Sequence, residues 1–182
     1  VQLFDDIINI IAMSEGAAVH RRWLAAGRHL YTPVTRNALE FGLAIPAACY
    51  LEALDFRTRR AREVVDISFA CVDAIATPTT PTVAPAMAMV KTLLATSDNL
   101  PFALGRNTKP ANFLGVPALT IPCGFSPDGL PVGLQLLARP HQERLLFDLG
   151  HAFQRASDFH LRRPNRPLDV TRPASPAINQ EG

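Results

Sequence analysis

The sequence contains only three cysteines, which are scattered and odd in number. This arrangement is not that of a disulfide framework or a zinc knuckle, so we expect a reducing compartment and a cytoplasmic location. The five histidines include no pair at positions i and i+4, the spacing that two metal ligands on one helix need. We therefore expect neither a metal site nor a cofactor.

Strong charge, abundant aromatic residues and an uninterrupted apolar run are also missing. A net charge of +2 and an aromatic content of 7% give no indication of a nucleic-acid partner. The stretch 67–90 is weakly charged, but it holds three prolines and Asp73, which would break a membrane helix of about 20 residues. The apolar run 7–13 follows two aspartates rather than basic residues, which is not typical of a signal peptide. We expect a soluble protein, and the start at Val1 suggests a fragment or a processed product.

The hydrophobic content of 48% is enough for a globular core. Apolar residues recur every three or four positions in three stretches, which predicts helices at 14–26, 47–72 and 141–157. Short apolar runs bounded by proline or glycine predict strands at 72–81, 115–125 and 130–138. Weaker signals predict a loop with a short helix at 84–96 and one or two helical turns at 110–114. This alternation indicates an α/β fold with one domain at 1–164 and a proline-rich tail at 165–182.

Four arginines crowd the middle of the helix expected at 47–72: Arg57, Arg59, Arg60 and Arg62. They could form an anion-binding face. Glu52, Asp55 and Glu63 lie among them, however, so we favour a solvated surface, with Asp55 and Arg59 paired at i and i+4.

The stretch Ser126–Gly129 (SPDG) predicts a tight turn, because proline, aspartate and glycine suit its successive positions. If Pro127 and Asp128 alone form the loop, one face of the hairpin carries the apolar pairs Cys123 with Val132, Ile121 with Leu134, and Leu119 with Leu136. The other face then carries Thr120 with Gln135, Pro122 with Gly133, and Gly124 with Pro131. A longer loop would shift this register.

The second face of this hairpin is small and polar, which has two explanations. A helix or a loop backbone could pack closely against it. Alternatively, it could form the floor of a ligand pocket, where Gln135 offers both a donor and an acceptor. From the residues alone we favour close packing.

Four stretches together resemble the C-terminal half of the amidase signature family. They are NTKPANFLGVPALTIPCGF (107–125), GLPVGLQLLARPHQERLLFDLGHAFQ (129–154), YLEALDFR (50–57) and VDAIATPTTPTVAP (72–85). The resemblance implies part of an α/β/α sandwich around a mixed, twisted sheet. It also implies hydrolysis of a non-peptide amide to a carboxylate and an amine or ammonia. In that family a serine attacks the carbonyl, a second serine in a cis peptide and a lysine relay protons, and backbone N–H groups hold the oxyanion.

The chain departs from the family in its catalytic residues, which belong to the N-terminal half. It has no Ser-Ser pair, and neither Lys91 nor Lys109 lies in a segment like that of the catalytic lysine. We therefore expect the chain alone to be inactive. Subunits of the family that amidate charged transfer RNA carry an acidic residue seven positions before the equivalent of Asn112. That position is Gly105 here, which counts against transamidation. A non-enzymatic binding module is a further alternative.

The resemblance implies that this half supplies one wall of the substrate channel. We expect six residues near that wall: Tyr50, Arg106, Thr108, Asn112, Cys123 and Gln135. Packing in the helix is an equal alternative for Tyr50, and we favour capping or loop hydrogen bonds for Thr108 and Asn112. Cys123 suits a small buried filler better than a nucleophile. The expected partners are a small-molecule amide and the missing N-terminal half. A second copy of the chain is a further candidate, because half a sheet exposes an apolar edge.

Overall fold

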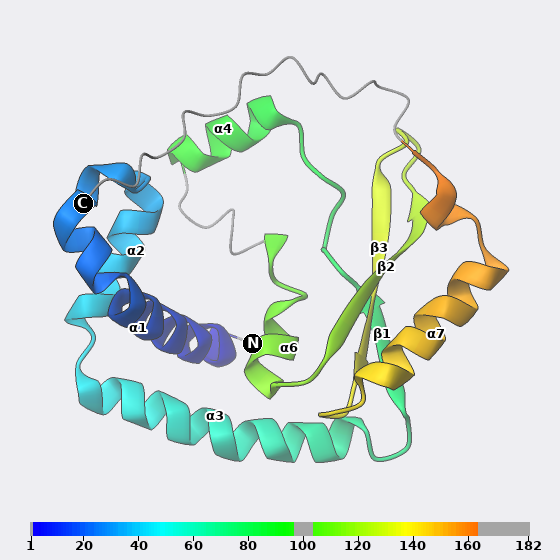
Figure 1. Ribbon diagram of the computed structural model, residues 1–182, viewed down its shortest axis with the longest axis horizontal. Coiled ribbons are helices and arrows are strands. Elements are labelled where there is room, and N and C mark those ends of the chain that lie inside the picture. Colours follow the sequence, from blue (N-terminus) through cyan, green and yellow to red (C-terminus); the bar gives the residue numbers. More distant parts are fainter. Residues whose placement is uncertain (1, 97–103, 164–182) are drawn as a thin grey trace.

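The computed structural model describes residues 2–96 and 104–163, so the tail expected at 165–182 lies outside the described residues (Figure 1). Its α-helices are α1 (Gln2–Gly27), α2 (Pro33–Ala44), α3 (Ala47–Ser68), α4 (Met87–Thr96), α6 (Lys109–Leu114) and α7 (Glu143–Ala156). Its strands are β1 (Ala74–Pro78), β2 (Ala118–Phe125) and β3 (Pro131–Ala138), and short 3-10 helices lie at Arg28–Leu30 and Phe159–Leu161.

The expected helices and strands are present, with two corrections at the N-terminal end. The helix expected at 14–26 is part of α1, which begins at Gln2. Because α1 packs against α2, α3 and α6, apolar residues surround much of it and no single stripe marks its first half. Helix α2 is absent from the sequence prediction. It begins at Pro33 behind the N-cap Thr32, whose hydroxyl accepts the Thr35 N–H at 3.4 Å.

The sheet of the described residues has the order β1-β3-β2, and both pairs of strands are antiparallel. The mixed sheet expected from the resemblance is therefore not present within 2–96 and 104–163. Helix α7 covers one face, where Leu146 packs against Ile121 and Leu136. The end of α3 and helix α6 cover the other face around Leu137, as Figure 1 shows. This arrangement of helix, sheet and helix confirms the α/β class.

The hairpin of β2 and β3 has the predicted register over most of its length. Thr120 lies opposite Gln135, and Ile121 lies opposite Leu134. The prediction is wrong near the turn, where Gly124 pairs with Val132 instead of Pro131 and Phe125 pairs with Pro131. Cys123 therefore does not pair with Val132, because the register shifts at a bulge between Pro122 and Gly124.

The length of the turn explains this bulge. The loop has three residues rather than two, because Ser126 N–H donates to the Leu130 carbonyl at 2.8 Å and Gly129 N–H donates to the Ser126 carbonyl at 2.9 Å. Gly129 has a φ of 78°, the left-handed conformation that such a loop requires. The extra loop residue moves the register by one, and the bulge moves it back.

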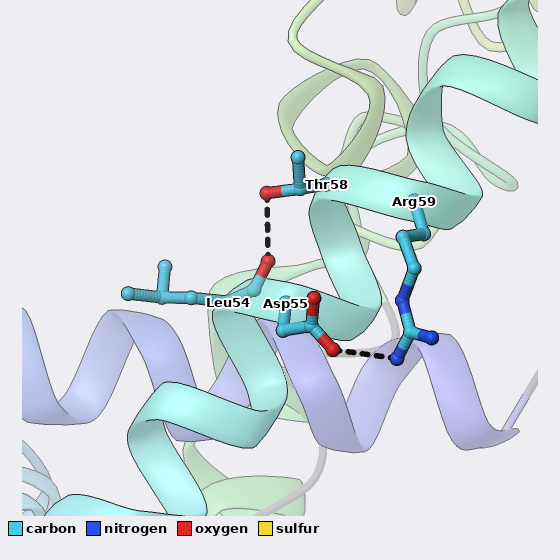
Figure 2. A network of polar contacts seen from close by, with 4 residues as sticks. All are labelled: Leu54, Asp55, Thr58 and Arg59. Atoms are coloured by element: carbon cyan, nitrogen blue, oxygen red, sulfur yellow. Dashed lines mark hydrogen bonds and ion pairs between the residues drawn. The ribbon is translucent and has the colours of Figure 1, made fainter.

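The arginines of α3 have separate roles. Arg59 forms an ion pair with Asp55 at 2.5 Å, while the neighbouring Thr58 hydroxyl donates to the Leu54 carbonyl at 2.8 Å (Figure 2). These exposed groups fit the solvated surface that the sequence favours. Arg57 differs, since its Nε donates to the Phe113 carbonyl at 2.8 Å and so joins α3 to the end of α6.

Candidate functional site

The polar face of the sheet centres on Gln135, which lies in the middle strand and is only 2% exposed. Its Nε2 donates to the Thr77 hydroxyl at 3.1 Å and to the Asn107 carbonyl at 3.0 Å. Both N–H groups of the amide are therefore used within the protein. Gln135 holds neighbouring segments in place and has no donor left for a ligand.

The segment 105–108 before α6 is fixed to the sheet by this amide and by a second one. Asn107 Nδ2 donates to the Pro78 carbonyl at 3.0 Å, at the end of β1. We call Thr77, Pro78, Asn107 and Gln135 the amide clamp. The Thr108 hydroxyl closes the segment on itself by donating to the Gly105 carbonyl at 2.9 Å, which is the loop hydrogen bond that the sequence favours for Thr108. The clamp thus fixes the backbone after Arg106 at Asn107, and the Thr108 hydrogen bond holds Gly105 before it.

Beside the clamp, the sheet is packed too closely for a larger residue. A Cβ atom at Gly133 would lie 2.8 Å from the Thr79 hydroxyl and 3.1 Å from the Thr120 methyl group. The two threonine hydroxyls are 3.3 Å apart. Close packing therefore accounts for the glycine of this face, while the exposed Thr120 borders open space.

Arg106 lies at a pocket of about 190 Å³ between the start of α1, α3 and α6. The walls are mostly carbon, from Phe4, Ile8, Val64, Pro110, Phe113 and Leu114. Charged groups border the pocket as well: Lys109 Nζ lies 3.1 Å from the Asp5 carboxylate. Within residues 2–96 and 104–163, the exposed Arg106 side chain has no hydrogen-bond or ion-pair partner. The pocket thus has an almost entirely apolar lining, with the exposed Arg106 at its border.

Tyr50 and Asn112 lie elsewhere. The Tyr50 hydroxyl donates to the Glu15 carboxylate at 3.1 Å, in a hollow between α1, α2 and α3. The hydrogen bond and the negative charge of Glu15 raise the pKa of Tyr50 above its ordinary value of 10.0. Asn112 is exposed on α6, and its carbonyl accepts a hydrogen bond from Arg57 at 3.1 Å. The structure does not bring either residue to the amide clamp.

Cys123 lies half-buried at the bulge of β2, where its thiol donates to the Val132 carbonyl at 3.5 Å. All three cysteines are free thiols. Of the six expected wall residues, only Arg106, Thr108 and Gln135 gather at one place. Thr77 and Asn107 were not among the residues expected from the sequence. The pairing of β1 with β3 would have indicated Thr77, because Thr77 lies directly opposite Gln135 in that pair.

Two further observations concern the described residues only. In residues 2–96 and 104–163, the histidine, cysteine, aspartate and glutamate side chains form no group of three that could hold a metal ion. No helix in that part of the chain is both long enough and apolar enough to cross a membrane.

Most of the chain is similar to known proteins in sequence and in fold. The model of the family described as Amidase matches residues 3–147. The chain is 41% identical over 142 residues to a glutamyl-tRNA(Gln) amidotransferase subunit of Chloroflexus aggregans, covering 74% of the chain and 28% of that protein. It is 43% identical over 120 residues to the corresponding subunit of Moorella thermoacetica, covering 64% of the chain and 23% of that protein.

Solved structures agree with this result. One described as an amidase superposes with a TM-score of 0.73 and 25% identity, over 84% of this chain and 35% of the other. Another, described as a vestigial protein complex that reveals the origins of an s-triazine catabolic enzyme, has a TM-score of 0.73 and 28% identity, over 89% and 36% of the two chains.

The fold is that of amidase signature enzymes, and the chain belongs to the amidase family. The resemblance drawn from the sequence motifs is thereby confirmed. The chain spans only 28% of the Chloroflexus aggregans relative.

Proposed function

We propose that this chain is the C-terminal part of an amidase that hydrolyses a carboxamide to a carboxylate and an amine or ammonia. Family membership supports the reaction class. The observation that supports a role in the substrate site is the amide clamp, because it fixes the backbone around Arg106 at the edge of a pocket. In this proposal Arg106 and Thr108 belong to the wall of the site, and Gln135 positions them.

The catalytic serines and lysine belong to a part of the protein outside this chain. The serines in the sequence are all isolated, namely Ser14, Ser68, Ser97, Ser126, Ser157 and Ser175. The sequence therefore offers no pair of adjacent serines like the one that the family uses for nucleophilic attack and proton relay. The chain alone is therefore expected to be inactive.

The test compares this chain with the longer protein that contains it. Both are assayed on simple aliphatic and aryl amides, and ammonia release is measured. Hydrolysis by the longer protein and none by the chain alone supports the proposal. Measurable turnover by the chain alone would contradict the absence of catalytic residues, and no turnover by either would contradict the amidase function.

A second candidate is the subunit of an amidotransferase. Two relatives that are 41% and 43% identical to the chain are named as amidotransferase subunits, which favours this candidate. Gly105 counts against it, since the resemblance places an acidic residue there in transamidating subunits. The two candidates differ in their reaction: glutamine-dependent amidation of glutamyl-tRNA by the longer protein with its partner subunits would favour the second candidate.

The proposal extends to partners and location. We propose that the remaining part of the protein packs on this chain in the cytoplasm, and that a second copy could also bind. Within residues 2–96 and 104–163, the outer strands β1 and β2 each pair with β3 only, and large apolar side chains are exposed on the helices, among them Trp23 and Phe41. Size-exclusion chromatography of the isolated chain tests this point. A monomer that unfolds cooperatively would contradict the need for a partner.

A further inference from the structure

The pocket beside Arg106 has the size and surface of a site for one ring. Its volume of about 190 Å³ exceeds the roughly 150 Å³ of a cavity that accommodates benzene. Phe113, which is 3% exposed, forms the inner wall and meets the Phe4 ring edge to face, with the ring centroids 4.8 Å apart. Walls of this kind favour an aryl group or a short branched alkyl group.

The charges at the pocket favour an anion on the same ligand. Asp5 and Lys109 neutralise each other at 3.1 Å, and the Lys109 side chain is only 16% exposed. Arg106 then remains as the charged residue at the border of the pocket that has no partner among the described residues. A guanidinium group binds a carboxylate through two parallel hydrogen bonds. The pocket is thus complementary to a molecule with an apolar body and a carboxylate.

The backbone geometry makes Arg106 suitable for selecting such a ligand. Its neighbour Asn107 is bonded to the sheet through both its side chain and its carbonyl, at 3.0 Å each. Gly105, on the other side of Arg106, is held through its carbonyl, which accepts the N–H groups of Thr108 and Lys109 at 3.1 and 3.2 Å. Only the side chain of Arg106 is left free to adapt, so less entropy is lost on binding than with a loose loop.

We propose that this pocket is the specificity pocket of the amidase, and that it takes the aryl or short alkyl body of an amide substrate that also carries a carboxylate, which Arg106 binds. This inference rests on the proposed function, because it names the substrate class of the same site. The pocket residues themselves come from α1, α3 and α6 together with the segment that precedes α6.

The experiment uses the longer protein and three amides: 4-carboxybenzamide, benzamide and acetamide. The expected order of kcat/KM is 4-carboxybenzamide, then benzamide, then acetamide. The variant Arg106→Gln should lose at least about tenfold more kcat/KM on 4-carboxybenzamide than on benzamide, mainly through KM, because only the first substrate carries the carboxylate. Arg106 is exposed, so the variant should fold. Arg62→Gln, an exposed arginine of α3 outside this pocket, is the matched control and should not change the ratio.

A binding measurement separates this inference from the proposed function. Terephthalate binding by calorimetry does not require turnover, and Arg106→Gln should weaken it about tenfold or more. If no amide is hydrolysed but terephthalate binds through Arg106, the amidase function fails and the pocket assignment stands. If amides are hydrolysed but Arg106→Gln affects all three equally and terephthalate does not bind, the inference is overturned and another segment of the protein occupies the pocket.

Discussion

The side chain of Gln135 lies directly across the strand pair from Thr77, and its amide donates to the Thr77 hydroxyl at 3.1 Å. The same amide reaches out of the sheet to the Asn107 carbonyl at 3.0 Å. One buried side chain therefore connects the middle strand, an outer strand and the segment that carries Arg106. This connection makes the position of the pocket depend on the sheet.

The variant Gln135→Leu should destabilise the protein by about 1–3 kcal/mol, because the Thr77 hydroxyl and the Asn107 carbonyl lose their donor in a buried place. The thermal unfolding midpoint measures this loss, and amide hydrolysis by the longer protein should fall as well. Gln142→Leu is the control: Gln142 is exposed, so its replacement should change stability by less than about 0.5 kcal/mol. If Gln135→Leu has the same unfolding midpoint and the same activity as the parent protein, Gln135 does not position the segment that carries Arg106.

The alternation of apolar and polar residues was sufficient to predict which face of each strand is buried. The pairing of Gln135 with Thr120, predicted from a two-residue loop, is present because the bulge offsets the third loop residue. The sequence was not sufficient to predict the bulge at Cys123. Two-residue and three-residue loops both suit the residues SPDG, and only the left-handed conformation of Gly129 decides between them. Residues 127–129 are exposed and, apart from its chain neighbours, no atom of the described residues lies within 4 Å of a Cβ built at Gly129, so the loop's own hydrogen bonds and the glycine conformation set this geometry.

Gly42 of α2 lies so close to α1 that alanine cannot fit. A Cβ atom there would overlap the Met13 carbonyl and lie 2.9 Å from the Ala17 Cβ. Gly42→Ala should therefore push the two helices apart and cost about 1–3 kcal/mol. Gly16→Ala should have the opposite sign, a gain of up to about 1 kcal/mol, since its nearest neighbour is 3.5 Å away and alanine favours helix. The thermal unfolding midpoints of both variants test the packing. A midpoint of Gly42→Ala equal to that of the parent protein would contradict the close contact between α1 and α2.

The helices at the N-terminal end show why part of this fold was missed. Thr32 and Pro33 are a recognisable start of a helix, and the side chain of Thr32 does cap α2. The apolar stripe of α1 is weak, however, because its neighbours contact it from several sides. The pocket at Arg106 could not be predicted either, since Phe4, Val64 and Phe113 come from three distant parts of the sequence.

Leu146 of α7 should be one of the most sensitive positions in the core. It is 2% exposed and packs between the helix and the sheet beside Ile121 and Leu136. Leu146→Ala should cost about 2–5 kcal/mol, because a cavity remains where the side chain was. The next residue provides the control: Phe147 is 64% exposed, so Phe147→Ala should have little effect unless another part of the protein covers it. Urea denaturation of both variants measures the difference, and similar midpoints would place α7 outside the core.

The pair of Tyr50 and Glu15 predicts a loss of stability at high pH. The neutral phenol donates to the carboxylate, whereas a phenolate would be repelled by it, so the pKa of Tyr50 lies above 10.0 in the folded protein. A pKa that is raised on folding stabilises the folded state fully below about pH 10, and this contribution disappears as the pH rises through the folded value. In a Tyr31→Phe background only Tyr50 contributes to phenolate absorbance, because the chain has two tyrosines. The titration midpoint should then lie above 10.0, and Glu15→Gln should lower it. An unchanged midpoint in Glu15→Gln would mean that Glu15 does not hold the phenol.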